Sequence, residues 1–166
     1  MQAMNSMQDL MLLTLQDLFT AEQQALQAYP QLMQAVQNPQ LRTAIEQHEQ
    51  ETQGHVRRLE QVFQQLGQQP QQAANPVMDC LMQHGRQMMQ AGGDPDVLEA
   101  ALICEAQKME HLEIAGYGTA VTFAKLLGNQ QAADLLGQTL DEEKRTDALL
   151  TQIAQSQTNR QAAQTA

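Results

Sequence analysis

The stretch that decides the fold is ICEAQKMEHLEIAGYGTAVTFA, residues 103–124. Its apolar residues recur at helical spacing and share one face of a predicted helix: Ile103, Ala106, Tyr117, Ala120 and Ala124. Glu110 and Glu113 fill the gap in this face between Ala106 and Tyr117 and, as an (i, i+3) pair, point the same way. Acidic side chains therefore occupy positions where core residues are expected.

Three other predicted helices carry the same feature near mid-length. On the first helix, Glu22 lies within the face formed by Leu15, Leu18, Ala25 and Tyr29. On the second, His48 lies in the apolar stripe with Glu51 and His55 beside it, and on the last, Glu143 and Asp147 complete the face at (i, i+4). Each long helix thus directs at least one ionisable group toward the predicted core.

Local signals delimit these helices. Asn38-Pro39, Asn75-Pro76 and Asp94-Pro95 are helix starts, while Gly67, Gly92-Gly93 and Gly128-Asn129 are stops. They predict long helices over about 6–36, 39–66, 95–127 and 129–154, and a short Met-rich helix over 76–90 that we expect to lie across the bundle. The fold class is all-α, a four-helix bundle with a long crossover containing a short extra helix. Residues 1–156 are expected to form one domain, and 157–166 a flexible C-terminal tail.

Composition excludes several classes. With 3% aromatic residues and no Trp among 166, the chain lacks the usual packing material of an all-β protein. Its net charge of −10 and scattered basic residues argue against nucleic-acid or membrane partners. Cys80 and Cys104 lack metal-type spacing, and residues 1–18 resemble neither a signal peptide nor a membrane span. We therefore expect a cytoplasmic protein.

The negative charge of the inward-facing carboxylates has to be balanced inside the protein. A buried carboxylate without a partner costs several kcal/mol, so six of them could not all be ionised without cations, although shared protons could neutralise some. Two divalent metal ions would balance four charges directly. The predicted ligands of a dinuclear site are Glu22, His48, Glu51, Glu110, Glu113, Glu143 and Asp147.

Each of these residues, taken alone, also has an interpretation without a metal ion. Glu22 alone could be a surface residue in a salt bridge, and His48 with Glu51 could be a hydrogen-bonded core pair. The run Glu142-Glu143-Lys144-Arg145 is typical of a surface salt-bridge patch. It is the joint occurrence of these residues on four helix faces that favours metal binding.

Four further residues stay open. His55 is an alternative ligand through its (i, i+4) relation to Glu51, and His111 is either adjacent to the ligands or on the surface. Tyr29 and Tyr117 are either core residues with satisfied hydroxyls or hydrogen-bond donors to ligands.

Several motifs resemble a known family. They are LFTAEQQAL at 18–26, the segment from His48 through Glu51-Thr52 to Glu60, EHLEIAGY at 110–117, and LDEEK at 140–144 with Asp147. Together they resemble the YciE/YciF-type bacterial stress proteins, a branch of the ferritin-like superfamily. The resemblance implies a ferritin-like bundle similar to rubrerythrin, with a di-iron or di-manganese carboxylate centre and a role in stress response.

The superfamily pattern is one Glu from each of two helices and Glu-x-x-His from each of the other two. Glu22 matches one single-Glu position, and Glu110 or Glu113 the other. The second helix instead reads His48-x-x-Glu51, the reverse order, and the last offers Glu143 with Asp147 where His is usual. Such an oxygen-rich shell suits Mn, Mg or Ca as well as Fe.

Two hypotheses follow. In the first, two metal ions, Fe or Mn, react with oxygen or peroxide. In the second, the chain is a non-catalytic stress or scaffold protein whose polar core shares protons or holds one structural ion. A homodimer formed through exposed apolar helix faces is compatible with both.

Overall fold

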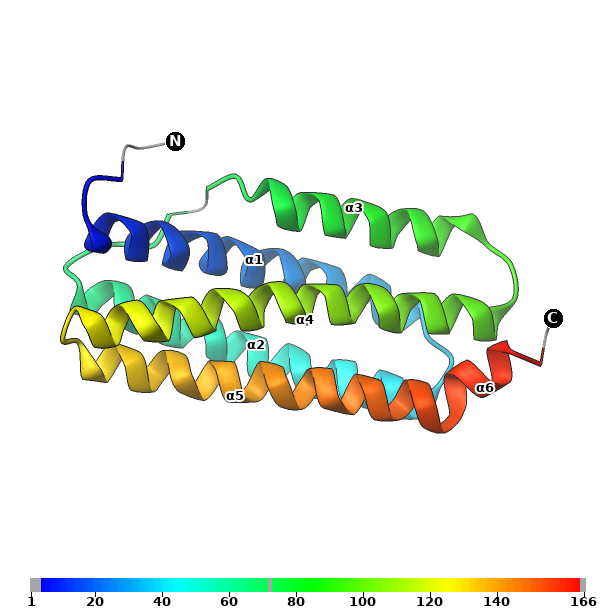
Figure 1. Ribbon diagram of the computed structural model, residues 1–166. Helices are drawn as coiled ribbons and strands as arrows, with labels where there is room; N and C mark the ends of the chain where they lie inside the picture. Colours follow the sequence, from blue (N-terminus) through cyan, green and yellow to red (C-terminus); the bar gives the residue numbers. More distant parts are fainter. Residues whose placement is uncertain (1–3, 72, 165–166) are drawn as a thin grey trace.

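Long helices dominate the chain (Figure 1). The computed structural model describes residues 4–71 and 73–164. The helices are α1 (Met7–Ala35), α2 (Pro39–Gln65), α3 (Pro76–Ala91), α4 (Pro95–Leu126), α5 (Gln130–Ile153), the π-helical turn η1 (Ala154–Thr158) and α6 (Asn159–Ala162). Among the described residues there is no strand, so the predicted all-α class is confirmed.

The helices begin at polar caps. The side chains of Asn38, Asn75, Asp94 and Asn129 accept hydrogen bonds from backbone N–H groups two or three residues further on. Proline occupies the first helical position of α2, α3 and α4, where its missing N–H costs nothing. Because these signals are local, the predicted starts and ends of the five main helices agree with the structure to within one residue.

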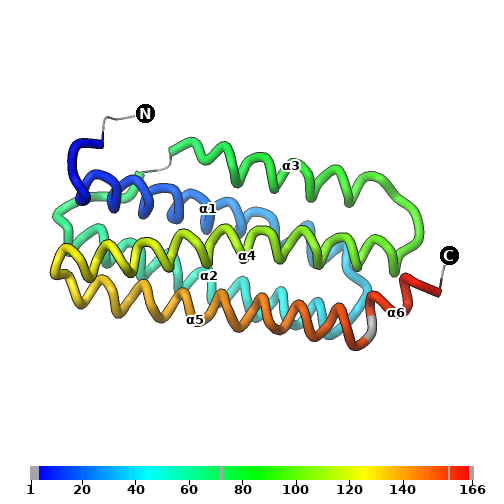
Figure 2. The backbone as a smooth tube through the Cα atoms, viewed as in Figure 1, coloured from blue at the N-terminus to red at the C-terminus, as the bar shows by residue number. Residues whose placement is uncertain are grey.

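Four helices form the bundle. Short turns join α1 to α2 and α4 to α5, and α1 also packs on α4 and α2 on α5 (Figure 2). The long connection after α2 returns along the bundle before α4 begins, so α2 and α4 run in the same direction (Figure 1). This is the predicted four-helix bundle with one long crossover.

The crossover helix α3 runs along the bundle and not across it, which corrects the expected orientation. At its start, Asn75 Nδ2 donates to the carbonyl of Asp17 at 3.0 Å, and one turn later Gln24 Nε2 donates to Asp79 at 2.6 Å. The crossover has to return the chain to the far end of the bundle. A helix of 16 residues covers about 24 Å of that distance.

Two apolar clusters fill the bundle. The first includes Met11, Leu15, Leu59, Tyr117 and Leu136, and the second includes Ala25, Ile45, Leu102, Ile103 and Leu150. The ionisable side chains of the four long helices lie where one cluster gives way to the other. The core is thus an apolar bundle interrupted by one polar layer.

A glycine allows α1 and α4 to approach closely beside this layer. A Cβ atom on Gly116 would lie only 2.7 Å from Cδ2 of Leu18. A larger residue at this position would force the Leu18 side chain to move.

The chain stays helical beyond residue 156. Through η1 and α6 the C-terminal segment packs against α4, and the side chain of Thr158 is buried. Asn38 Nδ2 lies 3.5 Å from Thr158 Oγ1. The domain boundary at residue 156 stays a prediction, and residues 165–166 of the expected tail lie outside the described residues.

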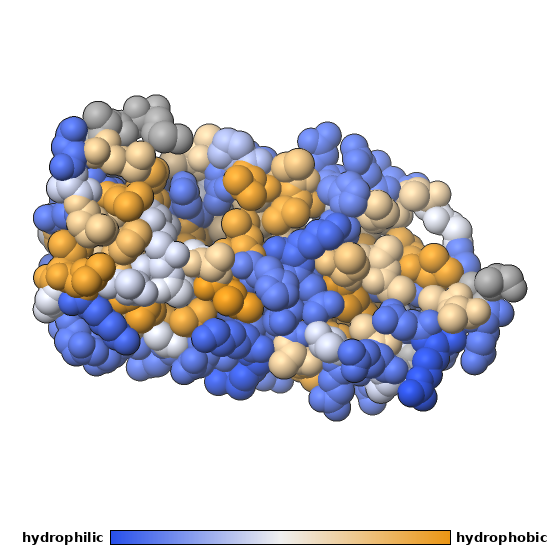
Figure 3. Space-filling model, viewed as in Figure 1, coloured by the Kyte–Doolittle hydropathy of each residue, from blue (hydrophilic) through white to orange (hydrophobic). Residues whose placement is uncertain are grey.

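The surface is mixed in character. Figure 3 shows hydrophobic residues interspersed with hydrophilic ones over the face that α3, α4 and α5 present. Leu126 and Leu127, at the turn between α4 and α5, are among the exposed large apolar side chains. In the part of the chain that the structure describes, no helix is both long and apolar enough to cross a membrane.

Candidate metal centre

Six ionisable side chains meet in the polar layer of the bundle, and all six are buried. They come from the four long helices: Glu22 from α1, His48 and His55 from α2, Glu110 and Glu113 from α4, and Glu143 from α5. Each lies on the core-facing stripe of its helix. Helical periodicity therefore accounts for how residues more than a hundred positions apart come together.

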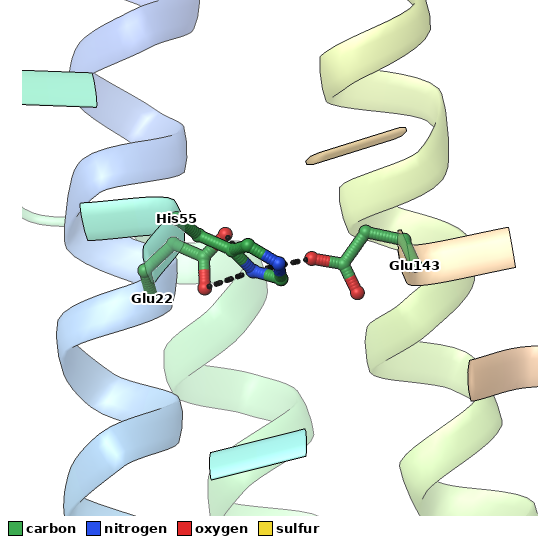
Figure 4. Close-up of side chains that lie close together, drawn as sticks. All are labelled: Glu22, His55 and Glu143. Carbon is green, nitrogen blue, oxygen red and sulfur yellow. Dashed lines mark hydrogen bonds and ion pairs between the residues drawn. The ribbon is translucent and has the colours of Figure 1, made fainter. Parts of the chain in front are cut away.

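Glu22, His55 and Glu143 form the inner triad (Figure 4). Nδ1 of His55 lies 3.2 Å from Oε1 of Glu22 and 2.9 Å from Oε1 of Glu143. One ligand-type atom from each residue lies within 4.8 Å of the others. The Tyr117 hydroxyl donates to Oε1 of Glu22 at 2.5 Å and fixes that carboxylate in place.

An ion pair between Glu142 and Arg58 holds the ring nitrogen of His55 that points away from the inner triad. Nε2 of His55 lies 3.0 Å from Oε2 of Glu142, which also accepts from Nη1 of Arg58 at 2.6 Å. Nη2 of Arg58 donates to the second Glu142 oxygen at 2.9 Å, and Nη1 also donates to Thr139. A carboxylate behind an imidazole is the usual way in which proteins orient a metal-binding histidine.

His48, Glu110 and Glu143 form the outer triad, which shares Glu143 with the inner one. Nε2 of His48 lies 3.3 Å from Glu110 and 3.5 Å from Oε2 of Glu143. The opposite ring nitrogen, Nδ1, lies 3.0 Å from the Thr146 hydroxyl and 3.6 Å from Glu51. His48 thus has one nitrogen in the cluster and the other toward the surface.

Several buried atoms of the cluster lack a hydrogen-bond partner among the described residues. They are Nε2 of His48, Oε2 of Glu110, Oε1 of Glu113 and both carboxylate oxygens of Glu143. Both Glu143 oxygens and Nε2 of His48 still make ion-pair contacts at 2.9–3.5 Å, whereas Oε2 of Glu110 and Oε1 of Glu113 are unsatisfied, at a cost of about 1–3 kcal/mol each. All are metal-ligand atom types, so these buried Glu and His side chains could hold a metal ion.

The imidazoles are strongly basic in this setting. Burial lowers the pKa of His55, but contact with the carboxylates of Glu143 and Glu22 outweighs it and raises the pKa to about 10. Burial likewise lowers the pKa of His48, while Glu110 and Glu51 raise it well above its usual range. Without metal, both rings are protonated near neutral pH and balance part of the acidic charge.

The carboxyls respond in the opposite sense. Burial raises the pKa of Glu113 well above its usual value, and the charges of Glu22 and Glu143 raise it further. Burial also raises the pKa values of Glu22 and Glu143, against the effect of His55. The cluster therefore holds a surplus of negative ligands that is balanced by protons when no metal ion is present.

Three predicted ligands lie outside the two triads: Glu113, which is buried in the same layer, and the partly exposed Glu51 and Asp147. The Glu51 side chain is 21% exposed and faces the outer nitrogen of His48, whose contact lowers the pKa of Glu51 to about 2. Asp147, also 21% exposed, accepts from Gln107 Nε2 at 2.9 Å and lies 3.5 Å from Nε2 of His111. The metal assignment of these three carboxylates stays a prediction.

The structure shows which of the four residues left undecided by the sequence lie in the cluster. His55 and Tyr117 lie in the cluster, with Tyr117 bonded to Glu22. Tyr29 is bonded to Thr52 and stands edge-on to His48, and the His111 side chain is 68% exposed.

The sequence indicated His55 and the Glu142–Arg58 pair that supports it less clearly than the other residues of the cluster. His55 follows His48 by seven residues on the same stripe, which was the available signal for its central position. Glu142 was interpreted as part of a surface patch, and Arg58 was not singled out. Only the packing of α2 on α5 reveals that the two residues pair behind His55.

Together, fold and site define a ferritin-like helical bundle with a buried carboxylate–histidine cluster. The chain belongs to the family described as "Domain of unknown function (DUF892)", whose model matches residues 6–163. It is 37% identical over 160 residues to protein YciF of Escherichia coli strain K12, covering 96% of both chains. The predicted membership of the YciE/YciF-type family is thereby confirmed.

Solved structures agree with this assignment. The E. coli stress protein YciF superposes with a TM-score of 0.90 at 36% identity, covering 94% of this chain and 99% of its own. YcfI of Rhodopseudomonas palustris, described as a candidate structural protein, gives 0.87 at 36% identity, covering 90% and 96%. A protein from Xanthomonas campestris pv. campestris, at 0.72 and 21% identity over 91% and 93%, shares the fold.

Proposed function

We propose that this chain is a stress protein whose buried cluster binds two divalent metal ions, iron or manganese, and reacts with oxygen or peroxide. The observation that carries the proposal is the pair of triads that share Glu143. A carboxylate common to two ligand sets is the arrangement that dinuclear centres use to hold their ions about 3.5–4 Å apart.

The proposed ligands are the six buried residues of the cluster. Glu22 and His55 would serve one ion, His48 and Glu110 the other, and Glu143 both, with Glu113 supplying a further carboxylate to the shell. Four carboxylates and two imidazoles form an oxygen-rich set that suits iron and manganese. When bound, such ions would supply the electrons that reduce oxygen or peroxide.

The protein's own residues prepare the site. Tyr117 donates to Glu22 and restricts that carboxylate to one orientation. Glu142, held by Arg58, accepts from Nε2 of His55, which leaves Nδ1 free to face the cluster as a ligand. The two apolar clusters on either side keep bulk water away from the layer.

Elemental analysis of protein purified without chelator tests the proposal, followed by addition of Fe(II) under air. We expect about two metal ions per chain and oxidation of Fe(II) faster than in buffer. A metal content below about 0.2 per chain, unchanged after incubation with Fe(II), would contradict it.

A non-catalytic role is the second candidate, because YcfI is described as a candidate structural protein and the ion pairs around His55 would also tie α1, α2 and α5 together. In that case the protein would bind metal without accelerating Fe(II) oxidation, or bind none. For either function we propose a homodimer, supported by exposed Leu126 and Leu127 and testable by light scattering.

A further inference from the structure

A hollow in the surface leads to the outer triad. It measures about 210 Å³ and lies between α2 and α5, lined by Ala44, Gln47, His48, Glu51, Arg145, Thr146 and Leu149. His48 belongs to both the wall of this hollow and the cluster, since its Nδ1 faces Thr146 and Glu51 while its Nε2 faces Glu110 and Glu143.

Ligand-type atoms follow one another from the surface inward. Glu51, 21% exposed, accepts from Gln47 Nε2 at 3.1 Å and reaches Nδ1 of His48 at 3.6 Å. From the other nitrogen of His48, Glu110 and Glu143 are 3.3 and 3.5 Å away. A cation that enters here would meet a carboxylate first, then an imidazole, then the buried carboxylates.

Toward the inner triad, the partly exposed carboxylate nearest the surface, Glu142, is already bound by Arg58. Nδ1 of His55 faces Glu22 and Glu143, and its Nε2 is covered by the Glu142–Arg58 pair. The His55 and Glu143 side chains are 0% exposed. Ions destined for both triads would therefore pass the His48 side first.

Glu51 and Arg145 place opposite charges at the mouth of the hollow. Arg145, 65% exposed, lies on the rim with Nη2 3.9 Å from Glu51, a long and solvent-exposed ion pair that contributes little stability. Glu51 consequently attracts an incoming cation, while Arg145 repels it and competes for the same carboxylate. The two residues should act on the rate of entry in opposite directions.

We infer that the hollow between α2 and α5 is the port through which divalent cations reach the centre, with Glu51 as the transit carboxylate and Arg145 as an opposing charge. This inference rests on the proposed function. It assigns Glu51 to the path of the ion and not to its final shell.

The test is the rate of Co²⁺ uptake by the full-length chain after chelator treatment, followed by stopped-flow absorbance, with the final Co²⁺ content measured separately. We expect Glu51→Gln to slow uptake about tenfold at unchanged final content, and Arg145→Gln to accelerate it about threefold at low salt only. Glu46→Gln and Lys144→Gln, exposed residues on the same helices, are the charge-matched controls and should load at the wild-type rate.

Uptake by Glu51→Gln at the wild-type rate would overturn the port while leaving the proposed function intact. A lower final content in Glu51→Gln would also overturn it, because Glu51 would then be a ligand of the bound ion. Wild-type protein that takes up no Co²⁺ would overturn the port and the proposed function together.

Discussion

The inner and outer triads share Glu143 and the same ligand chemistry, yet they are enclosed differently. In the inner triad, Tyr117 bonds to Glu22 and the Glu142–Arg58 pair holds His55, so its ligands are fixed before any ion arrives. In the outer triad, Glu110 keeps a buried oxygen without a hydrogen-bond partner among the described residues, and His48 lines a surface hollow. The difference indicates a preorganised inner position and a more accessible outer one.

Removing the shared carboxylate should have the largest effect on metal binding. Because Glu143 belongs to both triads, Glu143→Gln should lower the content from about two ions per chain to nearly none. Elemental analysis after reconstitution measures this. Asp141→Asn, an exposed neighbour on α5, is the control and should keep both ions. Full retention by Glu143→Gln would mean that the triads are not the binding sites.

Removing a carboxylate that belongs to a single triad should remove one of the two metal ions. Glu22→Gln should lose the inner ion and Glu110→Gln the outer one, each leaving about one ion per chain. The two variants serve as controls for each other in a metal titration. If each loses both ions, the triads bind as one unit and the contrast between them disappears.

Breaking the support of His55 should weaken binding without abolishing it. Arg58→Met leaves Glu142 without its cationic partner, so His55 is less firmly oriented and affinity for one of the two ions should fall about tenfold. The free energy of unfolding should drop by about 2 kcal/mol through the lost charged hydrogen bonds. Arg57→Met, at the exposed neighbouring position, should change neither the affinity nor the denaturation midpoint.

The smallest effect is expected at Asp147. Its carboxylate accepts from Gln107 and belongs to neither triad, so Asp147→Asn should keep both ions. Chemical denaturation should show a change in unfolding free energy within about 0.5 kcal/mol. Loss of an ion in this variant would restore Asp147 to the ligand set.

Much of the fold was predictable because helix starts are local. Asn38, Asn75 and Asp94 cap helices whose first residue is proline, and these three helices are followed by glycines with positive φ, Gly67, Gly92 and Gly128. The orientation of α3 was not predictable, since its amphipathic pattern fits any apolar surface. It depends on contacts such as Asn75 with Asp17.

The candidate site was predictable at the level of helix faces and not of partners. Periodicity placed Glu22, His48, Glu110, Glu113 and Glu143 inward, where the structure has them. It could not separate Glu51 from His55, which follow His48 by three and seven residues on the same helix. Only the position of α5 decides that His55 faces Glu143 while Glu51 faces the outer nitrogen of His48.

The proposed function requires that Glu143 be common to two bound ions. The decisive experiment is a crystal structure of the protein reconstituted with Mn²⁺ or Fe²⁺, with anomalous scattering recorded at the metal edge. We expect two peaks about 3.5–4 Å apart, one beside Glu22 and His55, one beside His48 and Glu110, and Glu143 bonded to both. A single peak, or two peaks that do not share Glu143, would contradict it.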